Sequence, residues 1–176
     1  MIYTLTTNPA VDLNVISNSI QPGVVNRTFS PIYTANGKGI NVSFVLKHFG
    51  VDSHILGFFG GFTGRYIVEE SEKKGVHVIP VWVDDTTRIN IFLNDGEKEF
   101  KFVNEGALVT RQQENEMLEL IQNLEDMTYL TVNGSLSKGM DEEFYERLMK
   151  VCKQKKVKVI LDISSNKLKE LMRYQP

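Results

Sequence analysis

A glycine-rich turn with a lysine at its centre is the segment of this sequence best suited to bind an anion. Gly37, Lys38 and Gly39 stand directly before an apolar run that begins at Ile40. Glycine allows a ligand to approach the backbone N–H groups closely, and a helix N-terminus favours negative charge. Lys38 adds a positive charge beside them. The turn therefore predicts a phosphate site, and the alternative is a turn whose glycines serve packing alone.

Two common nucleotide-binding loops do not fit this turn. A Walker A loop has Ser or Thr directly after its lysine, where this chain has Gly39. A dinucleotide-binding fingerprint has Gly or Ala at its sixth position, where this chain has Val42. The ligand of the turn is therefore not indicated by either motif.

Three further side chains could bind a phosphorylated and hydroxylated ligand. Asp12 lies on an expected strand and could accept hydrogen bonds from sugar hydroxyls. Arg88 and Asn90 are two residues apart, so they share one face of another expected strand. The arginine fork suits a phosphate and the carboxamide suits a hydroxyl. Each of the three also fits the polar outer face of a half-buried sheet.

The remaining candidates are less specific. The glycine cluster 57–64 falls between an expected strand and an expected helix, where it could line a ligand crevice or permit close packing. His48, His54 and His77 show no ligand spacing, so we expect neither a metal site nor a catalytic base from them. The single cysteine, Cys152, is expected to be a small core residue.

These residues must be positioned by two interleaved sets of elements. Buried strands are expected at 2–6, 53–59, 77–83, 129–132 and 157–161, alternating with helices at 40–49, 63–74, 110–123, 141–155 and from about 166. Half-exposed strands are expected at 11–17, 24–32, 87–93 and 97–103. The first set predicts an α/β body whose parallel sheet is covered on both faces. The second set predicts a smaller sheet, inserted at about 11–32 and 86–104.

Composition excludes several classes of protein. The 176 residues carry 20 Lys+Arg against 22 Asp+Glu, a formal charge of −2 that gives no basic stripe for nucleic acid and no polybasic membrane signal. One cysteine excludes an intramolecular disulfide framework. No apolar run approaches the length of a membrane span, and the first residues lack the pattern of an export signal. We therefore expect a cytoplasmic protein.

Three segments together resemble the ribokinase-like carbohydrate kinases. The motifs are Thr7-Asn8-Pro9-Ala10-Val11-Asp12, Asn36-Gly37-Lys38-Gly39-Ile40-Asn41-Val42 and Thr87-Arg88-Ile89-Asn90. They occur in the order found in that family, and they are most similar to its branch of 1-phosphofructokinases and tagatose-6-phosphate kinases. Residues 57–64, 133–135 and 161–164 resemble further segments of that family more weakly.

The resemblance implies a doubly wound α/β body with a small β-sheet lid. It implies transfer of the γ-phosphoryl group from ATP, with Mg²⁺, to fructose 1-phosphate, giving fructose 1,6-bisphosphate. Tagatose 6-phosphate is an alternative acceptor, and a non-catalytic sugar-phosphate-binding module is an alternative role. The resemblance also implies a homodimer that pairs through the lids.

Site residues follow from the resemblance position by position. The residues expected to hold the sugar and its phosphate are Asp12, Gly37, Lys38, Gly39 and Asn41, with Arg88 and Asn90 from the lid, Arg27 as a second phosphate contact, and Ser135 from a facing loop.

The chain also departs from the family pattern. Asn36 stands where the family has a glycine. The family's Gly-Ala-Gly-Asp segment, which carries its catalytic Asp, and its Asn-x-x-Glu element are not found in residues 1–176, so the resemblance implies that the catalytic Asp lies beyond Pro176. We therefore expect residues 1–176 to form the N-terminal part of one kinase domain and to lack the C-terminal part of the fold. We expect no catalytic residue and no metal site in them, and we expect the chain to be inactive on its own.

Overall fold

The computed structural model describes all 176 residues and contains two sheets. The strands are β1 (Ile2–Thr6), β2 (Ala10–Ser17), β3 (Thr28–Asn36), β4 (Ser53–Gly60), β5 (His77–Val83), β6 (Arg88–Asn94), β7 (Glu99–Phe102), β8 (Tyr129–Gly134) and β9 (Lys158–Ile163). The helices are α1 (Lys38–His48), α2 (Gly61–Lys73), α3 (Arg111–Asn123), α4 (Glu143–Lys155) and α5 (Leu168–Leu171), followed by a 3₁₀ turn, Met172–Tyr174.

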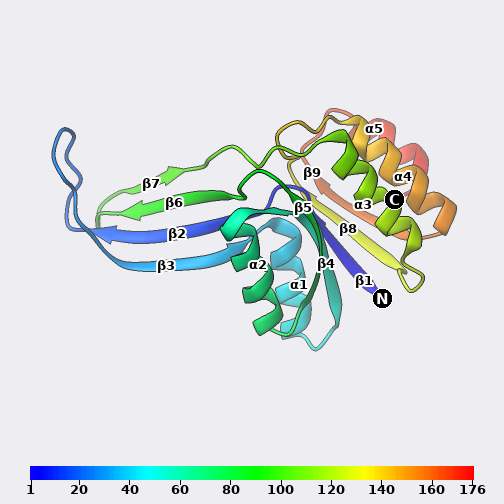
Figure 1. The fold of residues 1–176 in the computed structure, drawn as a ribbon, viewed down its shortest axis with the longest axis horizontal. Helices are drawn as coiled ribbons and strands as arrows, with labels where there is room; N and C mark the ends of the chain where they lie inside the picture. Colours follow the sequence, from blue (N-terminus) through cyan, green and yellow to red (C-terminus); the bar gives the residue numbers. More distant parts are fainter.

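The body is built on a five-stranded sheet in the order β5-β4-β1-β8-β9, and every neighbouring pair is parallel. Helices α1 and α2 pack on one face, and α3 and α4 pack on the other (Figure 1). This is the expected α/β class, because near-continuous apolar strands require cover on both sides. In the central strand, β1, Leu5 lies opposite Leu56 of β4 and Val132 of β8.

The two faces of this sheet carry separate hydrophobic cores. On the α3–α4 face, Met117, Phe144 and Leu148 are fully buried among strand residues. On the α1–α2 face, Ile40 and Ile67 are fully buried. Burial of this apolar area is the main force that holds the helices on the sheet.

The expectation of cover on both faces is wrong for β9. Ile160 of β9 is 55% exposed, and it borders an apolar groove that Val42 and Leu46 of α1 line from the other side. No helix of the chain lies over this part of the sheet, so the alternate side chains of β9 stay open on the α1 side.

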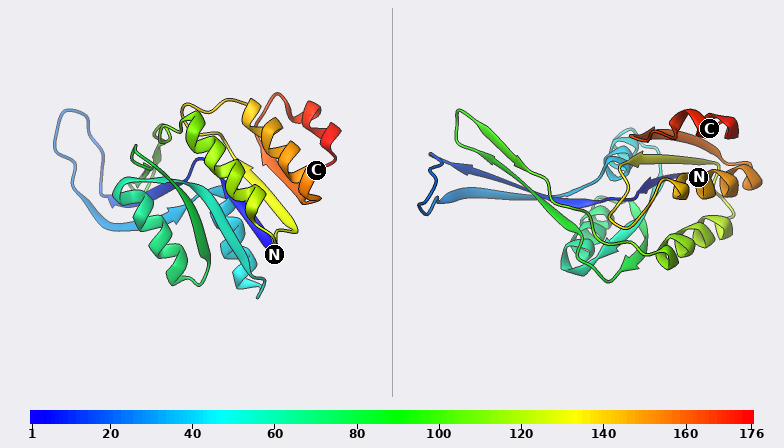
Figure 2. Two further views of the ribbon diagram at one scale, coloured as in Figure 1. Left: turned by 45° about the vertical axis from the view of Figure 1, so that its right-hand side comes forward. Right: turned by 90° about the horizontal axis from the view of Figure 1, so that it is seen from above.

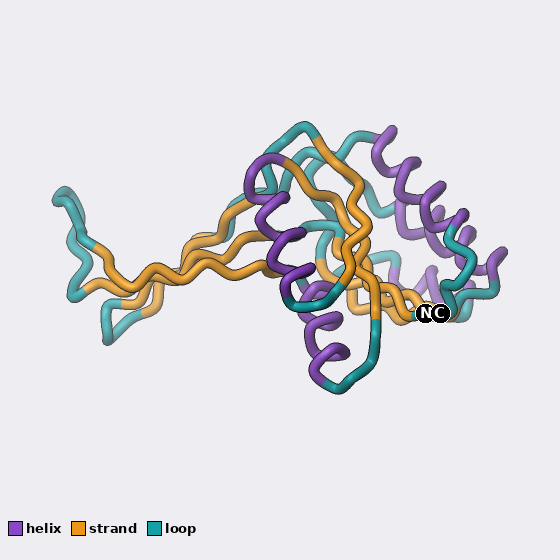
Figure 3. The backbone as a smooth tube through the Cα atoms, turned by 60° about the horizontal axis from the view of Figure 1, so that its bottom comes forward, coloured by secondary structure: helices purple, strands orange, loops and turns teal.

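The second sheet, in the order β3-β2-β6-β7, projects from the body as a long arm (Figures 1 and 2). Figure 3 shows its strands running together away from the helices. β2 pairs with β6 in parallel, and the outer pairs are antiparallel. The turn expected between β6 and β7 is confirmed, with the Asp95 carboxylate accepting from the N–H groups of Glu97 and Lys98.

The third strand begins later than the sequence suggests. An extended segment was expected at 24–32, whereas β3 spans Thr28–Asn36. The side chain of Asn26 bonds the backbone N–H and C=O of Gln21, which closes a loop before the strand. The apolar Val24 and Val25 lie in that loop and are exposed.

Helix ends follow local sequence signals. Thr110 caps α3 in a reciprocal capping box with Gln113, as its position before the helix predicts. Gly50 follows α1 with a φ of 74°, the left-handed conformation that glycine adopts without strain. The final helix is only the short α5, which begins two residues after the expected start near Asn166. None of the helices has the length and apolar character of a membrane span.

Candidate functional site

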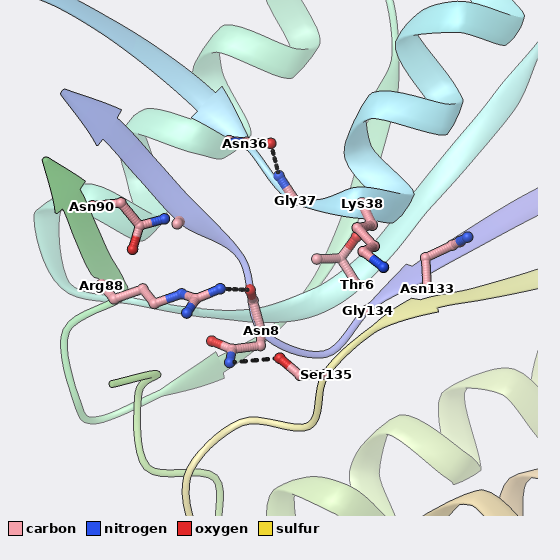
Figure 4. Close-up of a pocket in the computed structure, with 11 residues that line it drawn as sticks. Thr6, Asn8, Asn36, Gly37, Lys38, Arg88, Asn90, Asn133, Gly134 and Ser135 are labelled. Atoms are coloured by element: carbon pink, nitrogen blue, oxygen red, sulfur yellow. Dashed lines mark hydrogen bonds between the residues drawn. The ribbon is translucent and has the colours of Figure 1, made fainter. Parts of the chain in front are cut away.

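A polar cavity of about 160 Å³ lies where the arm meets the carboxyl ends of β1 and β8 (Figure 4). In open α/β sheets this end of the strands is where ligands bind. Ala10 is its one hydrophobic lining residue; the others are Thr6, Asn8, Asn36, Gly37, Lys38, Arg88, Asn90, Asn133, Gly134 and Ser135. The cavity therefore brings together all three motifs that the sequence singled out.

The two glycines of the anion-binding turn have different roles. A Cβ at Gly37 would lie 2.6 Å from Thr6 Cγ2, and a Cβ at Gly39 would lie 2.5 Å from Thr6 Oγ1. Only glycine allows the start of α1 to approach the end of β1 this closely. Gly37 lines the cavity, whereas Gly39 is buried behind it and does not.

The N-terminus of α1 opens toward the cavity. Gly37, the residue before the helix, has no side chain to cap it, and Thr6 Oγ1 accepts from the N–H of Ile40 at 3.1 Å. Lys38 is largely exposed and lies 3.6 Å from Asp162 at the end of β9. A helix end with an adjacent ammonium group favours an anion here.

Arg88 supplies the second positive charge. Its Nη1 donates to the carbonyl oxygen of Asn104 and its Nη2 to that of Asn8, both at 3.2 Å. Its Nε is buried and has no partner, and no carboxylate forms an ion pair with the group. Burial lowers the pKa of Arg88, since the charged form loses water. Arg88 is therefore a half-buried cation without a direct ion pair, although the charge of the nearby Asp12 carboxylate opposes the lowering of its pKa.

Asp12 lies behind the cavity wall. It is only 7% exposed and is not a lining residue. Its Oδ1 accepts from Asn90 Nδ2 at 2.9 Å, and its Oδ2 accepts from Asn36 Nδ2. Because a carboxylate can only accept, both carboxamides must turn their NH₂ groups toward Asp12.

The carboxamides complete the polar wall. Asn36 Oδ1 accepts from the N–H of Gly37 and from Asn41 Nδ2, each at 2.7 Å. Asn41 is thereby tied to the rim, where it is exposed and does not line the cavity. Asn90 Oδ1 is buried and has no partner, so it is free to accept a hydrogen bond from a ligand.

The floor comes from the loops after β1 and β8. Asn8 Nδ2 donates to Ser135 Oγ at 3.3 Å and to the Leu136 carbonyl at 3.2 Å (Figure 4). Thr7 Oγ1 donates to the Ser135 carbonyl at 2.8 Å. These bonds fix Ser135 beside the cavity, where the sequence expected it.

Several lining residues were not predicted individually. The residues missed are Thr6, Asn8, Ala10, Asn36, Asn133 and Gly134, of which all but Thr6 lie within the quoted motifs. Four of them, Thr6, Asn8, Asn133 and Gly134, could have been found from their position at or just beyond the carboxyl end of a parallel strand.

Two other expected features lie outside the cavity. Arg27 lies at the far end of the arm, in the loop before β3, and is exposed. The cluster 57–64 serves packing: a Cβ at Gly60 would lie 1.8 Å from the Asp85 carbonyl oxygen. The crevice interpretation of that cluster is not supported, because none of its members lines the cavity.

Chemically, the cavity suits an anion that also carries hydroxyl groups. Lys38, Arg88 and the start of α1 supply positive potential, while amide and hydroxyl side chains supply neutral donors and acceptors. No carboxylate is among the lining residues.

Comparison with known proteins agrees with this chemistry. A model of the pfkB family of carbohydrate kinases matches residues 5–176. The chain is 45% identical to a D-tagatose-1-phosphate kinase of Klebsiella oxytoca and 35% identical to a 1-phosphofructokinase of Bacillus subtilis. Both alignments cover 100% of this chain, but the chain spans only 58% of the length of each relative.

Solved structures show the same fold. A phosphofructokinase-like protein of Staphylococcus aureus superposes with a TM-score of 0.91 at 30% identity, over 99% of this chain and 56% of the other. The tetrameric inhibited form of phosphofructokinase-2 from Escherichia coli gives a TM-score of 0.89 at 28% identity, over 98% of this chain and 57% of the other. The expected ribokinase-like architecture is thus confirmed for the part of the fold that the chain spans.

Proposed function

We propose that this chain, which belongs to the pfkB family of carbohydrate kinases, binds the sugar phosphate that accepts the γ-phosphoryl group of ATP. The observation that carries this proposal is Arg88, a half-buried cation without a carboxylate partner, in the same cavity as the unpartnered Asn90 Oδ1. A phosphate would neutralise the first group, and a sugar hydroxyl would satisfy the second.

The acceptor that we favour is D-tagatose 1-phosphate. Two relatives, at 45% and 43% identity, are D-tagatose-1-phosphate kinases, whereas the 1-phosphofructokinases of Bacillus subtilis and Borreliella burgdorferi are 35% and 34% identical to the chain. D-Fructose 1-phosphate, the acceptor expected from the sequence, is the second candidate. Tagatose 6-phosphate, the acceptor of relatives at 30% identity, is the third. The first two carry their phosphate on C1 and leave the hydroxyl on C6 free.

In this mechanism the chain's residues hold the acceptor in place. Lys38, Arg88 and the N-terminus of α1 would bind its phosphate, and the carboxamides held by Asp12 would bind ring hydroxyls. Phosphoryl transfer depends mainly on positioning and on neutralising charge, so a fixed acceptor lowers the barrier. The arm would act as a lid, since it supplies Arg88 and Asn90 to the cavity.

The cavity does not provide a site for Mg²⁺ and ATP. Mg²⁺ in kinases is held by carboxylates together with the phosphates, and no carboxylate lines this cavity. None of the residues that line the cavity is a base that could take the proton of an acceptor hydroxyl. The location of the family's catalytic Asp beyond Pro176 stays a prediction. We therefore propose that the 176-residue chain binds the acceptor but does not by itself transfer the phosphoryl group.

Pairing of two chains through the arm forms part of the proposal. Ile16 of β2 and Phe29 and Ile32 of β3 are 43%, 44% and 59% exposed. Apolar side chains on an extended sheet favour association. Sedimentation of the chain as a dimer, reduced to monomer by Ile32→Lys, would support pairing, and a monomeric wild-type chain would contradict it.

Titration calorimetry tests the binding function directly. The chain is titrated with D-tagatose 1-phosphate, D-fructose 1-phosphate, D-tagatose 6-phosphate, unphosphorylated D-tagatose and inorganic phosphate. We expect at least one ketohexose phosphate to bind more tightly than both the free sugar and inorganic phosphate. If no ketohexose phosphate binds at millimolar concentration, the proposal is wrong.

A second measurement tests the lack of turnover. The chain is incubated with ATP, Mg²⁺ and each ketohexose phosphate, and ADP release is followed. We expect no ADP above the background without sugar. Sugar-dependent ADP release would show that the chain contains a complete catalytic site.

A further inference from the structure

One carboxylate holds two carboxamides side by side on the same wall of the cavity. Asp12 Oδ1 accepts from Asn90 at 2.9 Å and Asp12 Oδ2 accepts from Asn36. The two carboxylate oxygens share one carbon, so the amides that they hold must be neighbours. Both amides line the cavity, and we call Asn36 and Asn90 the amide pair.

The amide pair has one free acceptor oxygen, and each NH₂ group keeps one hydrogen that Asp12 does not take. Asn90 Oδ1 is buried without a partner. Asn36 Oδ1 is occupied by the N–H of Gly37 and by Asn41 Nδ2, each at 2.7 Å. Asn36 Nδ2 gives one hydrogen to Asp12 and keeps a second, because an amide NH₂ has two donors. Neither amide can flip without breaking its bond to Asp12.

An acceptor beside a donor suits two neighbouring hydroxyls that project to the same side of a sugar ring. One hydroxyl donates to Asn90 Oδ1 while its neighbour accepts from Asn36 Nδ2. D-Tagatose 1-phosphate and D-fructose 1-phosphate differ only in configuration at C4. In the furanose ring of the tagatose compound the hydroxyls on C3 and C4 are cis, whereas in the fructose compound they are trans. Only the cis pair can meet both amides on one wall.

We infer that Asn36 is a specificity-determining residue that favours the ketohexose phosphate with a cis C3–C4 diol. The inference rests on the proposed binding function and deepens it. Asn36 occupies a position where the sequence pattern of the family has glycine, which has no side chain to donate. A glycine here would remove the Asn36 donor beside Asn90 Oδ1, so the discrimination between the two epimers would be lost.

The test is a comparison of dissociation constants by titration calorimetry. D-Tagatose 1-phosphate and D-fructose 1-phosphate are each titrated into the wild-type chain, Asn36→Gly, Asn36→Ala and the control Asn123→Ala. Asn123 ends α3, is exposed and lies outside the cavity. Thermal melts of all four proteins establish that they are folded. The two Asn36 variants differ in backbone freedom but both remove the amide, so a shared effect belongs to the amide.

We expect the wild-type chain and Asn123→Ala to bind the tagatose compound more tightly. Loss of one neutral hydrogen bond should weaken that binding by about three- to tenfold in both Asn36 variants and leave the fructose compound nearly unchanged. Unchanged selectivity in folded Asn36 variants would overturn the inference while leaving the binding function in place. A wild-type preference for the fructose compound would also overturn it. Failure of the wild-type chain to bind either compound would remove the binding function, and the inference with it.

Discussion

Asn90 donates from Nδ2 to Asp12 Oδ1 at 2.9 Å, a buried hydrogen bond between residues 78 positions apart. The bond crosses from β6 to β2, which are parallel neighbours in register at these two residues. The pairing of Asp12 with Asn90 therefore depends on the sheet being assembled, and the polar wall of the cavity exists only in the folded arm.

Asp12→Asn should weaken binding of the acceptor. The substituted amide has an oxygen at only one of the two positions that face Asn36 and Asn90, and its NH₂ group at the other position faces a second NH₂ group, so one of the two asparagines loses its orientation. Hydrogen bonds to a charged group contribute about 1.5–3 kcal/mol, which predicts binding weaker by about tenfold or more. Calorimetry with D-tagatose 1-phosphate measures the change.

Asp84→Asn is the matched control for this variant, because Asp84 is exposed and lies outside the cavity. It should bind like the wild-type chain. Wild-type affinity in Asp12→Asn would show that Asp12 does not organise the amides.

Arg88→Met should remove most of the affinity for phosphorylated ligands. The variant keeps much of the side-chain volume but deletes the one cavity cation that is half-buried and has no carboxylate partner. We expect affinity for D-tagatose 1-phosphate to fall by about tenfold or more, since charged hydrogen bonds are the strong ones. The dependence of the dissociation constant on salt should also become shallower.

Arg88→Lys distinguishes charge from geometry. Lysine cannot reproduce the fork that reaches the carbonyls of Asn8 and Asn104, so it should recover only part of the affinity. Arg65→Met, on the exposed side of α2, is the control and should have no effect. Equal affinities for Arg88→Met and the wild-type chain would place the phosphate elsewhere.

Glu114→Gln should destabilise the fold without acting on the cavity. Glu114 is 2% exposed between α3 and α4, where its carboxylate accepts from Arg111 at 2.9 Å and from Arg147. Hydrogen bonds to a charged group contribute about 1.5–3 kcal/mol, and the partly exposed Arg111 and Arg147 recover some water when Glu114 loses its charge, so we expect a loss in this range. Urea unfolding should show a lower midpoint.

Glu116→Gln, on the exposed side of the same helix, should change the midpoint little. The double variant Glu114→Met with Arg147→Met should regain part of the loss, because it leaves no unpaired buried charge at this contact. If Glu114→Gln unfolds at the wild-type midpoint, the ion pair does not hold α3 on α4.

Sequence patterns predicted most of the body and five of the eleven residues that line the cavity. Buried strands and amphipathic helices depend on local periodicity, so their order and type could be inferred, and motif order placed Gly37, Lys38, Arg88, Asn90 and Ser135 at one site. The position of β3 was wrong by four residues, because Asn26 closes its loop through contacts with Gln21 that propensity does not reveal.

Side-chain orientation was the part that the sequence could not supply. Asp12 was expected to face the ligand, and whether it does remains a prediction. In the structure its oxygens are occupied by Asn36 and Asn90, which follows only from the pairing of β2 with β3 and β6. For the same reason, His54 and His77 lie far apart in the sequence but are partners on adjacent strands.

Acidification should destabilise the fold through His54. Its ring lies between those of Tyr3 and His77, with centroids 5.2 Å from each. Burial, and then the charge of His77, lower the pKa of His54 below its ordinary 6.5. The opposing charges nearby are Asp126, Asp52 and Glu72.

The sign of the effect follows from proton linkage. Between the lowered pKa and 6.5 the unfolded chain binds more protons at this site than the folded chain, so stability rises with pH. The contribution is fully present above 6.5 and is lost as the pH falls through the pKa of the folded state. Urea unfolding midpoints measured from neutral to acidic pH should therefore decline for the wild-type chain. His54→Phe keeps an aromatic ring between Tyr3 and His77 but cannot titrate, so its midpoint should decline less. Parallel declines for the two proteins would assign the acid sensitivity to other groups.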